Sequence, residues 1–299
     1  MVTVEQWQHR LLEAAGQDRW QLRPEGYHVR EGLERREQEN PYREIDYSSA
    51  SHRPHTTTSG EWPCYIGAVR RLLQLLPASG LVVDLGSGDG RLSQFLLEST
   101  TLDVVSLDID EANVSLSASR LLPRWRRRWL GLVEDIQLLT LPPACCDAML
   151  AMGVLNLFKP RLVPLLETLA GLLRPGGLLL DAEPTLEGAL LYAVARRSVG
   201  QFLLTARTAT KTTDFDRSDA PTVPVFDSGE MEAALEQAGL ELVERHPVSV
   251  LPSLVYGGWF HETPPEQADR VRIGEALEQL VSRGSTAARA MIFISRRPR

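Results

Sequence analysis

Three glycines and two aspartates crowd one short stretch of the chain, VVDLGSGDGR, residues 82–91. Gly86, Gly88 and Gly90 alternate with other residues there, and glycine accepts backbone angles that any side chain forbids. Such a turn lets a ligand come very close to the main chain. The apolar run before the turn is too short for a helix, so we interpret it as a buried strand. A cofactor site at the end of this strand is the first hypothesis.

The charges and spacing of the turn bear on which cofactor it takes. The dinucleotide fingerprint G-x-G-x-x-G places its third glycine where this chain has Arg91. Asp84 and Asp89 add two carboxylates, which repel a pyrophosphate held at a helix N-terminus. Both observations disfavour NAD. A cationic ligand with a primary amine fits a carboxylate in this position, and S-adenosylmethionine (SAM) is such a ligand.

Two further aspartates follow short apolar runs. Asp108 ends the run VVSLD, and Asp135 comes shortly after the apolar residues 130–133. Each has a purely structural alternative, since Asp108 could cap a helix starting near Glu111 and Asp135 could form a turn. The carboxyl ends of parallel strands meet at one edge of a sheet. The order of a glycine turn and two acidic strand ends therefore favours a single ligand site.

Short apolar strands alternate with amphipathic helices through the middle of the chain. This alternation is typical of a parallel sheet covered by helices on both faces. We predict an α/β fold, doubly wound, with a mostly parallel seven-stranded sheet. The strands are expected at 81–86, 104–108, 130–133, 148–151, 178–181, near 240–244 and at 290–295, and helices at 65–76, 111–121 and 162–173.

Two segments depart from the alternation. Residues 1–61 open with an amphipathic helix and continue into polar sequence, which predicts an N-terminal helical cap or lid before a ligand-binding domain at 62–299. Residues 184 to about 228 form an insertion after the fifth strand. Because ligands bind at the carboxyl edge of such sheets, the insertion predicts a lid or a substrate wall. A helical surface appendage is the alternative.

The stretch VVDLGSGDGR resembles the glycine-rich first motif of class I SAM-dependent methyltransferases. The resemblance continues in order through VVSLDID, VEDIQLLTLPPACCDAMLAMGVLNLF and LLRPGGLLLD, and it covers roughly residues 62–295. It implies a Rossmann-like methyltransferase domain with SAM as the cofactor.

The resemblance also implies a role for each matched position. Gly86 and Gly88 would let the backbone approach the methionine part of SAM, with Asp84 near its ammonium group and Asp108 accepting from both ribose hydroxyls. The other matched positions would surround the adenine and the sulfonium: Ile109 on the adenine face, Asp135 accepting from the adenine amino group, Ile136 donating from its backbone, and Ala151 and Met152 forming the floor beneath the sulfonium.

Composition narrows the partners and the compartment. The net charge of -7 and the pI near 5.5 argue against nucleic acid and anionic membranes as partners. Cys64, Cys145 and Cys146 lack zinc or disulfide-framework spacing, which predicts no metal site and a reducing compartment. Residues 1–20 lack the apolar core of a signal peptide, and no apolar run reaches about 18 residues. We expect a soluble cytoplasmic protein, and the sequence leaves its oligomeric state open.

The methyl acceptor is predicted to be a small molecule. Amino methyltransferases acting on nucleic-acid bases or protein glutamine keep an Asp/Asn-Pro-Pro-aromatic tetrapeptide after the fourth strand. This chain has AMGVLNLF there instead, which argues against DNA and RNA as substrates. The apolar insertion favours an enclosed pocket for a partly apolar acceptor, methylated on oxygen or nitrogen in bacterial or natural-product metabolism. Four aromatic residues support this pocket, with core packing as their alternative role: Trp62, Tyr65, Tyr192 and Phe202.

A general base is an option that the chemistry does not demand. Methyl transfer is an in-line displacement that depends mainly on holding the reactants collinear and dry. An oxygen acceptor of high pKa still benefits from a base within hydrogen-bond reach. Glu183, just past the fifth strand, is the first candidate, followed by His55, His261 and His52. A protein methyltransferase, an NAD enzyme and a non-catalytic SAM-fold partner protein stay open as alternative functions.

Overall fold

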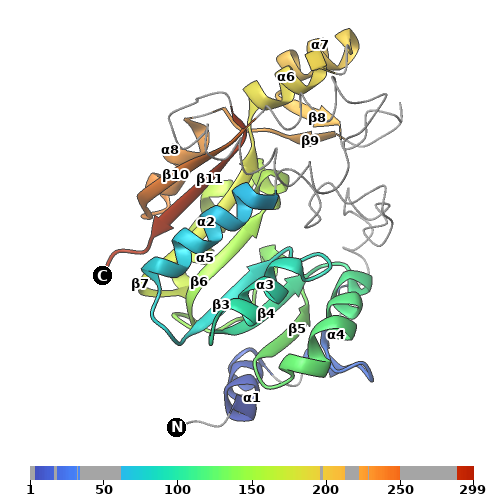
Figure 1. The fold of residues 1–299 in the computed structure, drawn as a ribbon, viewed down its shortest axis with the longest axis vertical. Helices are drawn as coiled ribbons and strands as arrows, with labels where there is room; N and C mark the ends of the chain where they lie inside the picture. The colour runs from blue at the N-terminus through green and yellow to red at the C-terminus, as the bar shows by residue number, and fades with distance from the viewer. Residues whose placement is uncertain are drawn as a thin grey trace.

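The computed structural model describes residues 4–16, 19–31, 33, 62–195, 198–212, 222–227, 229–249 and 288–299. A large twisted sheet runs through the molecule (Figure 1). Its nine strands, in sheet order, are β1 (Trp20–Leu22), β2 (His28–Arg30), β5 (Trp129–Val133), β4 (Asp103–Asp108), β3 (Leu81–Leu85), β6 (Cys146–Met152), β7 (Leu173–Pro184), β11 (Ala288–Arg296) and β10 (Glu241–Ser249).

Parallel pairing joins the strands from β2 through β7, and β11 runs antiparallel to both β7 and β10. The prediction of a doubly wound, mostly parallel α/β fold is therefore confirmed. The strands predicted at 104–108 and 148–151 correspond to β4 and β6 within two residues. These strands could be recognised because both of their faces are buried, which makes them continuous apolar runs.

The predicted strand count of seven is wrong, because the N-terminal segment adds β1 and β2 to the edge of the sheet. His28 pairs with Leu132 of β5 in parallel register. The helix α1 (Val4–Ala14) exists as predicted, but it does not cap the carboxyl edge. The Gln8 side chain donates to the carbonyl of Trp129, which places α1 at the amino end of β5. The described part of the N-terminal segment therefore completes the core.

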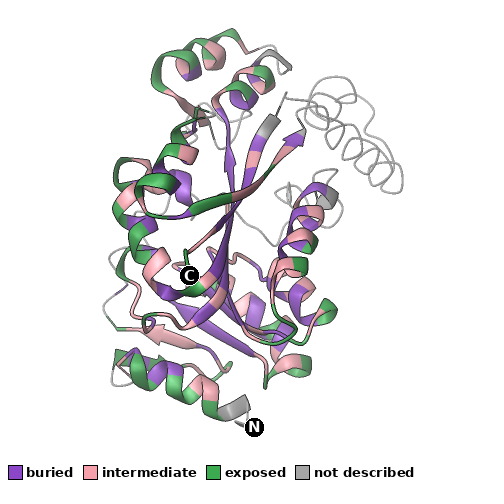
Figure 2. Cartoon of the chain, turned by 90° about the vertical axis from the view of Figure 1, so that its left-hand side faces the viewer, coloured by how far each residue is buried: buried purple, intermediate pink, exposed green. Residues whose placement is uncertain are grey.

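Helices cover both faces of the sheet. One apolar cluster joins α1, α5 (Leu162–Leu172) and α8 (Glu230–Gln237) to one face, and a second cluster joins α2 (Trp62–Leu75), α3 (Arg91–Ser99) and α4 (Glu111–Trp125) to the other. Alternate residues of each strand belong to alternate clusters: Val82 packs with the second and Val83 with the first. Figure 2 shows the buried strands between partly exposed helices.

The insertion after β7 contains the helices α6 (Leu186–Ala195) and α7 (Val199–Thr208), followed by a small antiparallel sheet of β8 (Thr210–Thr212) and β9 (Thr222–Pro224). In Figure 1, α6 and α7 lie at the opposite end of the molecule from α1. Phe226, just past β9, donates its amide to the carbonyl of Pro184 at 3.0 Å. This bond fastens the insertion to the carboxyl end of β7. Within the described residues, every helix is too short or too polar to cross a membrane.

Candidate active site

A cavity of about 250 Å³ lies at the carboxyl edge of the sheet. Its walls come from the loops that follow β3, β4, β5 and β6 and from the carboxyl end of β7, and β8 of the insertion adds to them. The chain reverses its direction of winding next to β3, where β4 lies on one side and β6 on the other. Ligands of doubly wound sheets bind at such switch points. The cavity is therefore the candidate active site.

The glycine turn leaves room for a ligand against its backbone. Gly86 and Gly88 have φ values of +62° and +53°, a region that side chains rarely adopt. A Cβ built on Gly86 would meet the side chain of Val154 at 3.0 Å, whereas one built on Gly88 has no atom of the described residues within 4 Å. Both glycines line the cavity. Gly88 is thus the place where bare main chain faces open space.

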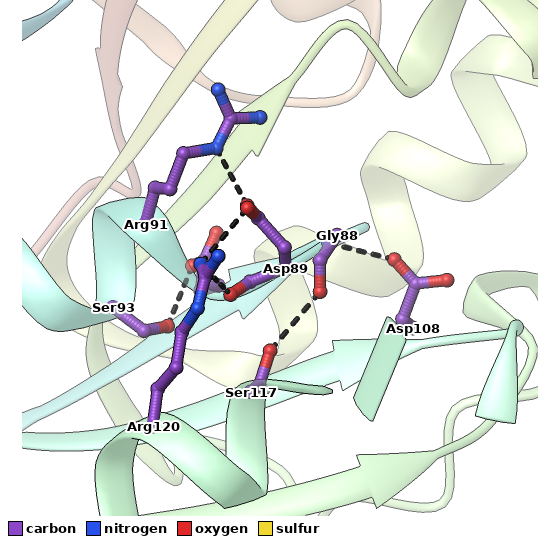
Figure 3. Close-up of polar contacts among 8 residues, drawn as sticks. Gly88, Asp89, Arg91, Ser93, Asp108, Ser117 and Arg120 are labelled. Carbon is purple, nitrogen blue, oxygen red and sulfur yellow. Dashed lines mark hydrogen bonds and ion pairs between the residues drawn. The ribbon is translucent and has the colours of Figure 1, made fainter. Parts of the chain in front are cut away.

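Asp108 presents its carboxylate to this turn. Its Oδ2 accepts from the amide of Gly88 at 2.8 Å (Figure 3). Its Oδ1 accepts from the amide of Asp110 at 2.9 Å. The helix-cap alternative for Asp108 is wrong, because Asp110 caps α4 by accepting from the amide of Ala112. Burial raises the pKa of Asp108 to about 6. Near neutral pH, Asp108 is a charged acceptor on the cavity wall.

Asp84 is the second buried carboxylate of the turn. Ser93 donates to Asp84 Oδ2 at 2.6 Å, and Ser93 is linked through Ser106 to the indole of Trp129. Burial raises the pKa of Asp84 to about 7. A cationic ligand group beside it would hold it ionised.

The other aspartate of the turn, Asp89, is paired with two arginines. Arg91 Nε donates to one of its oxygens at 2.6 Å and Arg120 Nη1 donates to the other at 2.9 Å (Figure 3). Arg91 also lines the cavity, and its Nη1 has no hydrogen-bond partner within the described residues. Sequence reasoning used Arg91 only to exclude NAD and missed it as a wall residue.

Ile109, Asp135 and Ile136, which were predicted to surround the adenine, are wall residues of the cavity. The turn-former alternative for Asp135 is also realised, since its Oδ1 accepts from the amide of Gln137 at 2.8 Å. This bond does not conflict with the predicted adenine contact, because a carboxylate accepts several hydrogen bonds.

Glu134 is a wall residue that sequence reasoning missed. Its Oε1 accepts from Arg30 Nη1 at 2.8 Å and from the hydroxyl of Thr140. Its Oε2 is buried with no partner among the described residues. The signal was its position directly before Asp135. Arg30 belongs to β2, a strand that the sequence did not predict.

The floor of the cavity requires one correction. Met152 lines it, but Ala151 lies in the apolar core and is not among the cavity's wall residues. Adjacent residues of a strand point to opposite faces of the sheet, so Ala151 and Met152 cannot both face one ligand. Gly153 and Val154 continue the wall beyond Met152.

Glu183 does not lie on the cavity wall. Its Oε1 accepts from the amide of Leu155 at 2.8 Å and its Oε2 accepts from the amide of Asn156 at 3.1 Å. Burial raises its pKa to about 8. Its carboxylate therefore holds the start of the 3-10 helix η5 (Leu155–Arg161). The other base candidates, His52, His55 and His261, lie outside the described residues.

Among the predicted aromatic residues, Tyr65 lines the cavity. Phe158 of η5 and Pro184 of β7 add apolar surface to the cavity wall. Asn156 and Lys211 add polar groups to it. Asn156 and Lys211 were missed, because no motif surrounds either of them in the sequence.

Residues 82–177 match the family model described as a methyltransferase domain. About a third of the chain is therefore similar to a methyltransferase domain. The matched residues contain the glycine turn, Asp108 and Asp135, which contribute to the cavity wall. No curated protein matches the chain.

Solved structures share the fold of the methyltransferase. A SAM-dependent methyltransferase from Mesorhizobium loti is 19% identical, with 80% of this chain and 98% of that chain covered and a TM-score of 0.56. The 1,6-didemethyltoxoflavin-N1-methyltransferase of Burkholderia thailandensis, solved with 1,6-didemethyltoxoflavin and S-adenosylhomocysteine (SAH), is 16% identical, with 81% and 80% covered and a TM-score of 0.51. The [4+2]-cyclase SpnF is 15% identical, with 78% and 80% covered and a TM-score of 0.51.

The residues of the cavity fit SAM. Gly88 offers a place where a Cβ would enter open space, and the carboxylates of Asp84 and Asp108 suit an ammonium group and a pair of hydroxyls. Two buried side-chain groups on the wall, Glu134 Oε2 and Arg91 Nη1, await partners from outside the described residues. An acceptor and a donor of this kind match a ligand that carries both amino groups and a carboxylate.

Proposed function

We propose that this methyltransferase transfers the methyl group of SAM to a small-molecule acceptor, on oxygen or nitrogen. The observation that carries the proposal is that the wall of one cavity combines residues of the glycine turn and the strand ends with residues of the insertion. Asp84, Asp108 and the glycine turn line one part, and Pro184 and Lys211, at and beyond the start of the insertion, line another. The cavity thus joins a cofactor region to a region that the insertion encloses. Enclosure suits a small acceptor better than a protein segment.

We propose the following division of work among the wall residues. Asp108 binds the ribose hydroxyls, and Asp84 lies near the ammonium group. Asp135 and the backbone of Ile136 bind the adenine edge, with Ile109 against its face. Bound SAM supplies an electrophilic methyl group on a sulfonium. Met152 and Tyr65 exclude water from the acceptor region, because apolar and aromatic surface lines the cavity there.

We propose that Glu183 acts as a positioning residue. Both of its oxygens are bound to backbone amides at the start of η5, which fixes Asn156 at the cavity wall. A substrate proton would have to compete with these two amides for the carboxylate. His55 and His261 stay predictions for a general base.

The wider predictions continue as proposals. We propose residues 62–299 as the SAM-binding domain, with residues 184–228 as its cap. The net charge of -7 supports a substrate other than nucleic acid. Cys64, Cys145 and Cys146 form no disulfide within the described structure, which supports a cytoplasmic location.

An activity screen tests the proposal. The full chain is incubated with SAM and a library of small hydroxylated and amino compounds, and SAH release is measured against the chain without acceptor. We expect acceptor-dependent SAH in the wild type and its loss in Asp108→Ala. Methylation of peptides with none of the small molecules would favour a protein methyltransferase. SAH binding without turnover on any acceptor class would favour a non-catalytic SAM-fold protein.

A further inference from the structure

One cation projects into the cavity from the insertion. Lys211, the middle residue of β8, lines the cavity and is partly buried. It forms no hydrogen bond or ion pair with the part of the chain that the structure describes, and burial lowers its pKa. The other cationic wall residue, Arg91, is already paired with Asp89. The carboxyl group of Glu183 opposes the lowering of the Lys211 pKa, but its two oxygens accept from backbone amides at the start of η5. The N–H groups of Lys211 therefore have no acceptor among the described residues, which leaves a place for an anion beside Lys211 in the cavity.

The frame around Lys211 is well fastened. Lys211 pairs with Val223 of β9, and Val223 is buried. Directly after it, the carbonyl of Pro224 accepts from Asn156 Nδ2 at 3.0 Å, and the carbonyl of Val225 accepts from Lys159 Nζ at 2.8 Å. The hairpin of β8 and β9 is thus tied to η5.

Hydrogen bonds also connect η5 and the end of the insertion to β7 of the large sheet. Glu183 of β7 binds the amides of Leu155 and Asn156, which hold η5, and Phe226 binds the carbonyl of Pro184. Lys211 is therefore placed over the cavity by packed structure on two sides. A residue held in this way offers a fixed charge to a ligand.

The charges of the cavity are separated along its length. Asp84, Asp108, Glu134 and Asp135 line the part formed by the loops after β3, β4 and β5, where the cofactor is proposed to bind. Lys211 stands in the part formed with the insertion. Asn156, which is bonded to the β9 strand that pairs with Lys211, also lines the cavity. Its Oδ1 is buried and has no partner among the described residues. This second region offers one cation and one neutral amide group to the acceptor.

We propose that Lys211 binds a carboxylate of the methyl acceptor, so that the substrate of this methyltransferase is a small organic acid. The inference rests on the proposed function. Within a cavity of about 250 Å³, a positively charged donor and the Lys211 ammonium group would repel each other. An acceptor with a negative charge relieves that repulsion and accepts from the Lys211 ammonium group, which Glu183 attracts without a hydrogen bond among the described contacts. The Lys211 ammonium group donates to the carboxylate, and Asn156 is placed to orient a second polar group of the acid.

Binding to the SAH-loaded full chain tests the inference. The probes are matched pairs of an acid and its primary amide: 3-hydroxybenzoate, 4-hydroxybenzoate and 4-aminobenzoate with their amides. Each pair shares its shape and differs in charge. We expect at least one acid to bind the wild type about tenfold or more tightly than its amide, measured by calorimetry. We also expect Lys211→Met to remove this preference and Lys211→Arg to keep most of it.

Arg207→Met is the matched control, because Arg207 is an exposed cation of the same insertion on α7. It should keep the acid preference. Binding of SAH alone is measured first on every variant. Absence of SAH binding in the wild type would refute the proposed function itself.

Provided that the wild type binds SAH, three results overturn the assignment of Lys211. They are equal binding of acid and amide by the wild type, an acid preference that survives in Lys211→Met, and loss of SAH binding in Lys211→Met with its melting temperature unchanged. If Lys211→Met fails to fold, the wild-type comparison of acids and amides and the Lys211→Arg variant decide the matter.

Discussion

Replacing Asp108 by Ala should weaken the binding of SAH by roughly thirtyfold. The Asp108 carboxylate has about four lone-pair sites, and the amides of Gly88 and Asp110 occupy one on each oxygen. The Asn113 side chain also donates to the carboxylate, and the remaining capacity is available to a ribose diol. Hydrogen bonds to a charged acceptor contribute about 1.5–3 kcal/mol each. If water compensates for one of the two lost bonds, the net loss is about 2 kcal/mol, which is roughly thirtyfold in Kd.

The assay is isothermal calorimetry with SAH, accompanied by a thermal melt of each variant. Asp110→Ala is the matched control, because Asp110 caps α4 two residues away by accepting from Ala112. Loss of that cap should lower stability by about 1 kcal/mol and leave the affinity for SAH unchanged.

The pH dependence gives a second view of Asp108. Burial raises the pKa of Asp84 to about 7 and that of Asp108 to about 6. Since the ligand binds the carboxylate forms, protons compete with it, and the wild-type Kd should rise as the pH falls through about 7 and then 6. Asp108→Ala should lose the lower step. A folded Asp108→Ala protein that binds SAH within about threefold of the wild type would refute the assignment of Asp108 to the ribose.

Three further substitutions test other parts of the site. Gly88→Ala should abolish SAH binding, and its positive φ should cost about 1–2 kcal/mol in stability. In Gly86→Ala the added Cβ also meets Val154 at 3.0 Å, so the melting temperature should fall further. Equal SAH affinity in Gly88→Ala and the wild type would contradict the proposed backbone contact. The raised pKa of Asp84 means that its ionisation costs stability as pH rises from about 4 through about 7. Asp84→Asn should therefore raise the free energy of unfolding at pH 8 by up to about 4 kcal/mol while weakening SAH binding. Denaturant titrations of the wild type and the variant at pH 5 and pH 8 check the sign, and an equal gain in the free energy of unfolding at both pH values would count against it. Asp181, a buried residue whose two carboxyl oxygens lack partners in the described structure, should be replaceable by Val with a gain of about 1–3 kcal/mol, and a lower melting temperature would show that its carboxyl group is bonded.

The sequence predicted the central strands and the acidic strand ends because local patterns encode them. Asp84 and Asp108 each end a continuous apolar run, and the glycine turn follows the first of them. The N-cap alternative for Asp108 failed because Asp110, closer to the helix start, takes that role. Local patterns could not reveal β2, a three-residue strand whose pairing partner β5 lies about a hundred residues away in the chain.

Lys211 and Asn156 were missed for the same reason. Lys211 stands in polar, Thr-rich sequence, and only the hairpin with β9 and its bonds to η5 bring it to the cavity. Glu183 was placed correctly at the end of β7, but the direction of its carboxylate depends on the η5 amides, which a strand pattern does not encode. Position along a strand was predictable, and contacts between distant segments were not.

Calorimetry of the purified full chain with SAH and, in parallel, with NADH tests the central claim most directly. The account predicts heat of binding with SAH at a single site per chain and none with NADH. Heat with NADH alone, or no heat with SAH on a folded protein, would contradict the assignment of the glycine turn and Asp108 to a SAM site.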